Sequence, residues 1–155
     1  MTIKDPFDIV IDCVRAKFAE LVASPKHSIS QLPKEMPKSG IYLFSEGGVP
    51  LYVGRTNHLR KRFQYHIRNN HNQATFAFLL ARRETGNLKA SYKPEGSRKH
   101  LLTDSGFRTS FDMARNRIKL MDVQFVEEAD PIKQTLLEVF AAFETNAKFN
   151  DFDNH

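Results

Sequence analysis

The chain has 155 residues, a formal net charge of +5 near neutral pH and a single cysteine. This length is sufficient for one domain with a hydrophobic core, and one cysteine excludes both an internal disulfide framework and a cysteine-rich zinc site. The N-terminus is polar and lacks the apolar core of a signal peptide, and no apolar run approaches membrane-spanning length, so we expect a cytoplasmic protein with no membrane partner.

The first predicted element is an amphipathic helix that ends at about Ala23. Asp5 supplies an N-cap and Pro6 a first-turn proline. Apolar residues then recur at helical spacing. They are Phe7, Val10, Ile11, Val14, Phe18 and Leu21. We expect this helix either to cover a sheet or to form a homodimer interface, and we expect Cys13 to be buried in its apolar face.

A connector and a β-hairpin are predicted next. Three prolines lie in 24–39, and we group this extended connector with the preceding helix as an N-terminal region, 1–38. Two β-branched and aromatic runs then flank Glu46-Gly47-Gly48. A three-residue loop with a left-handed glycine places Tyr42 and Tyr52 on one face, where two phenols beside a basic helix indicate a phosphate site. The opposite, core-facing side would carry Ile41, Leu43, Leu51 and Val53.

A basic helix is predicted from about Asn57 to Asn69. Its apolar stripe consists of Leu59, Phe63 and Ile67. Arg62 and His66 lie beside that stripe, so we expect both at the edge of the domain, facing the hairpin. An arginine can hold a phosphate through a pair of hydrogen bonds. The alternatives are a solvated arginine at position 62 and a half-buried structural histidine at position 66.

The rest of the chain predicts two helices separated by a polar, basic loop, then a strand and a final helix. The approximate bounds are 74–83 for the first helix, 85–105 for the loop, 107–117 for the second helix, 120–127 for the strand and 131–148 for the last helix. The strand is predicted from alternation of apolar and polar residues. With the hairpin, it completes an α+β fold with a small three-stranded antiparallel sheet flanked by helices.

Glu138 lies within the last predicted helix, in a run that is apolar almost all round. Such a helix is expected to be buried, and a carboxylate within it must be paired or bound to a cation. Ala141 and Ala142 leave room beside the carboxylate for a hydrated ion, and magnesium favours oxygen ligands. We therefore predict a metal ligand at Glu138, with a buried Glu–Arg pair as the alternative.

Charged residues are distributed unevenly along the chain. Residues 47–103 contain eleven Lys and Arg against two Asp and Glu, whereas 121–155 contain two Lys against eight Asp and Glu. A basic middle of this kind is typical of a nucleic-acid-binding surface, with an ordinary solvated surface as the alternative. The predicted DNA contacts are Arg55, Arg60, Lys61, Arg68, Lys89, Lys93, Arg98 and Lys99.

The hairpin and several later residues resemble the signature of the GIY-YIG nuclease family. Gly40-Ile41-Tyr42 matches the first motif, and Tyr52-Val53-Gly54 matches the second with valine in place of isoleucine. Either tripeptide alone is a weak signal, and the specificity comes from the residues that follow in the same order and at similar spacing. These are Arg62, His66, Glu138 and Asn150.

The resemblance implies a metal-dependent DNA endonuclease domain over 39–155, with a basic insertion at about 74–117. Tyr42, helped by Tyr52, would activate or orient the attacking water, and Arg62 would stabilise charge on the phosphoryl oxygens. Glu138 would hold Mg²⁺ or Mn²⁺. The remaining residues carried over from the family are His66 as a catalytic residue and Gly40, Gly54 and Asn150 as supporting residues.

The partner implied by the resemblance is DNA, either duplex or branched. Two alternatives stay open from the sequence. One is a catalytically inactive DNA-binding module, and the other is a nuclease subunit that requires a protein partner.

Overall fold

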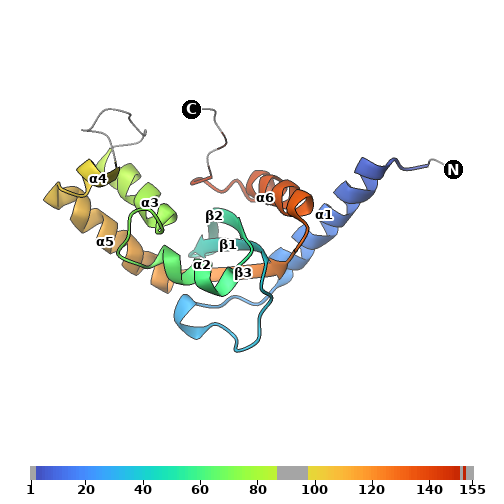
Figure 1. The fold of residues 1–155 in the computed structure, drawn as a ribbon, viewed down its shortest axis with the longest axis horizontal. Coiled ribbons are helices and arrows are strands. Elements are labelled where there is room, and N and C mark those ends of the chain that lie inside the picture. The colour runs from blue at the N-terminus through green and yellow to red at the C-terminus, as the bar shows by residue number, and fades with distance from the viewer. Residues whose placement is uncertain (1–2, 87–97, 151, 153–155) are drawn as a thin grey trace. The chain divides into compact units, whose positions relative to one another are not determined.

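The computed structural model describes residues 3–86, 98–150 and 152 (Figure 1). Its elements in chain order are α1 (Pro6–Ala23), η1 (Ile29–Gln31), β1 (Gly40–Glu46), β2 (Val49–Thr56), α2 (Leu59–His66), α3 (Thr75–Thr85), α4 (Arg98–Leu101), α5 (Ser105–Leu120), β3 (Asp122–Glu127) and α6 (Pro131–Thr145). The predicted α+β class with one three-stranded antiparallel sheet is confirmed. No helix among the described residues is both long and apolar enough to cross a membrane.

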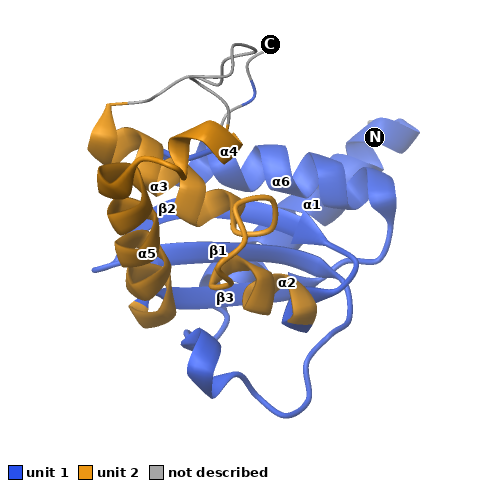
Figure 2. Ribbon diagram, turned by 60° about the vertical axis from the view of Figure 1, so that its left-hand side comes forward, with its two compact units in different colours: residues 1–60, 121–155 blue, residues 61–120 orange. Residues whose placement is uncertain are grey.

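The chain forms two compact units (Figure 2). Unit 1 comprises residues 1–60 and 121–155 and contains the sheet with α1 and α6. Unit 2 comprises residues 61–120 and contains α3, α4 and α5. This division differs from the predicted boundary between 1–38 and 39–155, because residues 1–38 belong to the same unit as the sheet and residues 61–120 form a unit of their own.

The sheet has the strand order β2-β1-β3, with β1 antiparallel to both neighbours. Gly47 and Gly48 form a two-residue turn with φ of +58° and +80°, so the predicted three-residue loop is wrong. Such a turn alone would place Tyr42 opposite Val53. The register shifts after the turn, however, so that Phe44 pairs with Tyr52 and Tyr42 pairs with Gly54. This β-bulge at Leu51 puts Tyr42 and Tyr52 on one face, as predicted.

The opposite face of the sheet packs against α1 and α6 to form the core of unit 1. Its buried residues from the sheet are Ile41, Leu43, Val53 and Val126, and those from the helices are Val14, Leu21, Leu137, Ala141 and Ala142. The rings of Phe18 and Phe140 meet edge to face at 5.2 Å. The prediction that the first helix covers the sheet is therefore confirmed.

The first half of α1 is less buried than its apolar pattern predicts. Phe7 is 59% exposed and Cys13 is also exposed, so the predicted burial of Cys13 is wrong. The helix begins as predicted, since the Asp5 carboxylate accepts a hydrogen bond from the Asp8 amide and Pro6 occupies the first turn. The buried residues of α1 are Val14 and Leu21, which lie further along the helix than Phe7 and Cys13.

The connector before the hairpin is more ordered than an extended segment. His27 forms an antiparallel bridge with Val123, through hydrogen bonds of 3.0 and 2.7 Å, and its ring stacks on Phe125. The short helix η1 follows. Arg60 then donates hydrogen bonds to the carbonyls of Pro33 and Lys34. The Arg60 guanidinium thus fastens the connector. From the sequence, Arg60 was predicted only as a DNA contact.

Unit 2 is built on the packing of α3 against α5. Phe78 contacts Phe107 and Phe111, with ring centroids 5.1 and 6.2 Å away. Helix α5 begins before its predicted start because the Asp104 carboxylate caps the Phe107 amide at 2.8 Å. Part of the predicted loop is helical as α4, and Lys89 and Lys93 lie outside the described residues.

Candidate active site

Tyr42 lies on the central strand and its ring crosses toward the edge strand β2. A Cβ atom on Gly54 would lie 2.2 Å from both the Cζ and the hydroxyl oxygen of Tyr42. The phenol therefore occupies the space that the glycine leaves free. Tyr52 lies beside it, with ring centroids 6.4 Å apart. Tyr42 is only 1% exposed and Tyr52 is half-buried, so of the two phenols Tyr52 is the more accessible.

Position 40 also requires glycine, because the backbone of the neighbouring strand β3 approaches it closely. A Cβ atom at this position would lie 1.9 Å from the Val126 carbonyl oxygen on β3. Neither Gly40 nor Gly54 has a positive φ, so backbone contact and ring contact, not conformational freedom, account for the two glycines. The predicted supporting role of the two glycines thus has a steric basis: Gly40 lets β3 approach, and Gly54 makes room for the Tyr42 ring.

Glu138 forms an ion pair with Arg55, with Nε and Oε2 3.3 Å apart. The Glu138 side chain is 23% exposed and the Arg55 side chain 46% exposed. The predicted burial of α6 on all sides is wrong, because Val139 and Phe143 on the same helix are 46% and 81% exposed. Burial therefore does not by itself require a cation at Glu138. The Glu–Arg pair that we considered as the alternative is present, although it is partly exposed.

The Tyr42 phenol and the Glu138 carboxylate contact neighbouring residues of β2. The Tyr42 ring lies over Gly54, and the next residue, Arg55, forms the ion pair with Glu138. Successive strand residues face opposite sides of a sheet, and β2 is an edge strand. The Tyr42 ring and the Glu138–Arg55 ion pair thus contact adjacent residues of this edge strand, on opposite faces of the sheet.

Asn150 closes the outer edge of the same strand. Its side-chain oxygen accepts a hydrogen bond from the Val53 amide at 2.8 Å, and its side-chain nitrogen donates to the Val53 carbonyl at 2.7 Å. The neighbouring Phe149 amide donates to the Leu51 carbonyl at 3.0 Å. Asn150 therefore satisfies an otherwise unpaired strand edge and fixes the backbone beside Tyr52. From the sequence, Asn150 was predicted only through its family position, without a physical reason.

Arg62 and His66 belong to unit 2. His66 is fully buried and its ring meets Phe76 edge to face, so its predicted place at the edge of the domain is wrong. Burial, reinforced by the positive charge of Arg62, lowers the pKa of His66 to about 3. The imidazole is therefore neutral near pH 7. Arg62 is half-buried.

The single carboxylate of the site, Glu138, fits a metal site that is completed by water and substrate phosphate. Within the described ranges, no group of three or more His, Cys, Asp and Glu side chains could hold a metal ion. Magnesium, however, is often bound by one or two carboxylates together with water and substrate phosphate. Glu138 can supply one such carboxylate, and Arg55 is the cation that it contacts in the free protein.

The predicted DNA-contacting side chains have different surroundings. Lys61 and Arg68 lie over the Tyr65 ring, at 5.6 and 4.7 Å from its centroid. Arg98 donates to the His71 carbonyl, and Lys99 is exposed. Sequence reasoning did not single out Tyr65 or His71, although the spacing of Tyr65 from Lys61 by one helical turn is a signal for such a contact.

Comparison with known proteins provides no assignment. No family model, no curated protein and no solved structure matches this chain.

Proposed function

We propose that this protein is a metal-dependent DNA endonuclease of the GIY-YIG type, which hydrolyses phosphodiester bonds at the Gly54–Arg55 edge of the sheet. The observation that carries the proposal is that Tyr42 and Glu138 contact adjacent residues of β2, Gly54 and Arg55. Hydrolysis of a phosphodiester needs a group that orients or deprotonates water and a group that stabilises charge on the leaving side. A phenol and a carboxylate at one strand edge provide candidates for both.

The proposed roles follow from accessibility and contact. Tyr52, which is half-buried beside Tyr42, orients the attacking water, and Tyr42, ionised to the phenolate, accepts the proton that this water loses. Arg55 carries a permanent charge and exchanges its ion pair with Glu138 for a phosphate oxygen of the substrate. Asn150 is a positioning residue, since it acts through the backbone of Val53.

Glu138 would hold the divalent ion together with the substrate phosphate. Bound Mg²⁺ or Mn²⁺ would supply Lewis-acid stabilisation of the leaving oxygen. For Glu138 to do this, its carboxylate must leave Arg55, and the partial exposure of both side chains keeps the cost of that exchange small.

A catalytically inactive DNA-binding protein is the second candidate. It is favoured by the ion pair, which leaves Glu138 neutralised by Arg55, and by the near-complete burial of Tyr42. In this alternative the tyrosine pair and the Glu–Arg pair only stabilise the edge of the sheet.

Removal of single hydroxyl groups separates the two candidates. Tyr42→Phe and Tyr52→Phe keep the rings and their packing, so the endonuclease proposal predicts a large loss of magnesium-dependent plasmid nicking with little change in melting temperature. The inactive-module alternative predicts that the wild-type protein does not cleave, and that the variants differ from it only in stability. Supercoiled plasmid should be assayed with and without magnesium beside each thermal melt.

A further inference from the structure

The two units of the chain differ strongly in charge. Among the described residues, unit 2 contains eleven Lys and Arg against three Asp and Glu, whereas unit 1 contains ten against twelve. The positive charge of the protein is therefore concentrated in residues 61–120. A surface with such an excess of one sign attracts a polyanion by long-range electrostatics.

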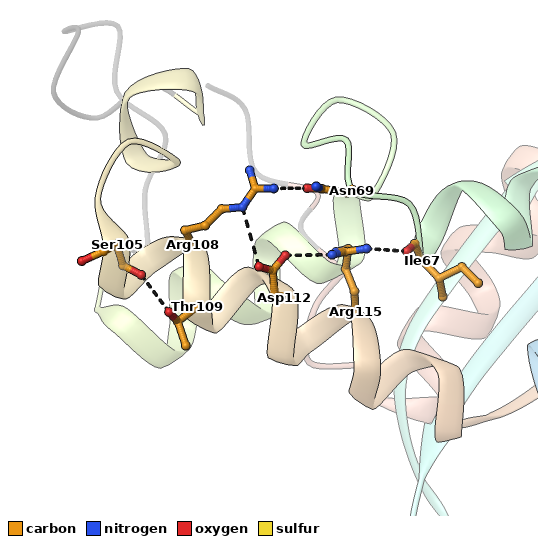
Figure 3. Close-up of polar contacts among 7 residues, drawn as sticks. All are labelled: Ile67, Asn69, Ser105, Arg108, Thr109, Asp112 and Arg115. Carbon is orange, nitrogen blue, oxygen red and sulfur yellow. Dashed lines mark hydrogen bonds and ion pairs between the residues drawn. The ribbon is translucent and has the colours of Figure 1, made fainter.

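Three arginines of unit 2 donate hydrogen bonds to alternate residues of the turn that follows α2. Arg115 donates to the Ile67 carbonyl at 2.9 Å, and Arg108 donates to the side-chain oxygen of Asn69 (Figure 3). Arg98 donates to the His71 carbonyl at 3.1 Å. We call Arg98, Arg108 and Arg115 the arginine row. The sequence did not single out Arg108 or Arg115.

Among the described residues, the hydrogen-bond acceptors of the arginine row are mostly uncharged. The Ile67 and His71 carbonyls and the Asn69 amide are neutral. Asp112 is the carboxylate that forms ion pairs with the row, at 3.7 Å from Arg108 and 2.8 Å from Arg115 (Figure 3). Of the carboxylates that the structure describes, one thus forms ion pairs with this row of three guanidinium groups, and the exposed Lys99 adds a further positive charge.

The surroundings of His71 give independent support for an uncompensated positive field. Burial lowers the pKa of its imidazole first, and the positive charges of Arg98, Arg108 and Lys99 lower it further. All three electrostatic contributions have the same sign. Positive side chains therefore surround His71 among the described residues of unit 2.

The row is also held in fixed orientation while keeping free hydrogen-bonding capacity. A guanidinium has five N–H donors, and the contacts described above engage only some of those on Arg98 and Arg108. Arg98 packs over the Phe78 ring at 5.0 Å, and the Arg108 side chain is 39% exposed. Groups that are already oriented lose less conformational entropy when they bind a ligand.

We propose that the arginine row, with Lys99, binds successive phosphates of a duplex DNA backbone and so anchors the substrate on unit 2. The inference rests on the proposed function, which it deepens by naming where the substrate is held. Contacts of this kind are independent of base sequence. The competing explanation is that the arginines only fasten the turn at residues 67–71 to α4 and α5.

The test measures binding of a short fluorescein-labelled duplex by anisotropy across a range of sodium chloride, in EDTA so that no cleavage occurs. The variants are Lys99→Gln, Arg108→Gln and their combination, with Lys26→Gln as the matched control, because Lys26 is an exposed lysine of unit 1. Each lost phosphate contact should reduce the slope of log affinity against log salt by about 0.9. The double variant should reduce it by about 2, and Lys26→Gln should leave it unchanged.

If Arg108→Gln disturbs the turn, Lys99→Gln alone still tests the inference, because none of the contacts described for the arginine row involves Lys99. Equal slopes in all variants, or no binding by the wild-type protein, would overturn the inference. Plasmid cleavage in magnesium is measured in parallel. Cleavage with unchanged slopes refutes the anchor but leaves the endonuclease proposal standing, whereas reduced slopes without cleavage support the anchor and refute the endonuclease.

Discussion

Gly54→Ala adds one methyl group where the Tyr42 ring crosses strand β2. The new Cβ would lie 2.2 Å from two atoms of the phenol, far inside van der Waals contact. Tyr42 is 1% exposed, so the ring has no solvent space into which it can turn. Overpacking of this kind costs about 1–3 kcal/mol, while replacing glycine by alanine in a strand otherwise stabilises by about 0.5–1 kcal/mol. We therefore expect a net destabilisation of about 1–2 kcal/mol.

Urea denaturation of Gly54→Ala measures this loss, with Gly106→Ala as the matched control. Gly106 lies in the first turn of α5, where the nearest atom to an added Cβ is a side-chain oxygen of Asp104 at 3.2 Å. This oxygen caps the Phe107 amide and must shift by a few tenths of an ångström, which offsets the gain in helix propensity of about 1 kcal/mol, so alanine should destabilise less there than at Gly54. In a Tyr42→Ala background the penalty at Gly54 should vanish, which is a coupling that a double-mutant cycle detects. Equal stability of Gly54→Ala and wild type would show that the ring does not lie over Gly54.

Three further predictions follow from the surroundings of single side chains. Asn150→Ala should lower the free energy of unfolding by about 1–3 kcal/mol, because the Val53 backbone loses both hydrogen bonds; an unchanged urea midpoint would contradict this. His66 has a pKa of about 3 in the folded protein against 6.5 ordinarily, so the unfolded chain binds the proton more tightly and stability should fall as pH decreases from about 6.5 toward 3. His66→Gln should flatten that part of the stability–pH curve, and an identical curve would refute the burial. Cys13 is exposed, so a thiol reagent should label the native protein as fast as the urea-unfolded chain, and protection in the native state would place it in the core.

Elements whose signals are local were predicted well from the sequence. The strands of the hairpin, the capped start of α1 and the third strand follow from alternation, turn residues and capping residues that lie within a few positions of one another. The face shared by Tyr42 and Tyr52 was predicted correctly for a reason that was partly wrong. A two-residue turn and a bulge at Leu51 replace the predicted three-residue loop, and the two arrangements leave the same alternation of residue types.

Burial and pairing could not be predicted as well, because they depend on tertiary contacts. The apolar run around Glu138 does not reveal that α6 exposes Phe143, nor that Arg55, distant in sequence, forms its ion pair. The position of His66 beside an apolar stripe is compatible with either an exposed or a buried ring, and only the packing of Phe76 decides between them. The arginine row has no local signal, since its acceptors are mostly backbone carbonyls far away in sequence.

The most direct test of the central claim compares Glu138→Gln with Glu144→Gln in magnesium-dependent cleavage of supercoiled plasmid. Both variants replace a glutamate on α6 by its neutral isostere, and Glu144 is exposed. The proposal predicts that Glu138→Gln abolishes cleavage while retaining the fold and DNA binding, and that Glu144→Gln cleaves like the wild-type protein. Cleavage by Glu138→Gln at the wild-type rate would contradict the assignment of Glu138, and the absence of any cleavage by the wild-type protein would contradict the endonuclease itself.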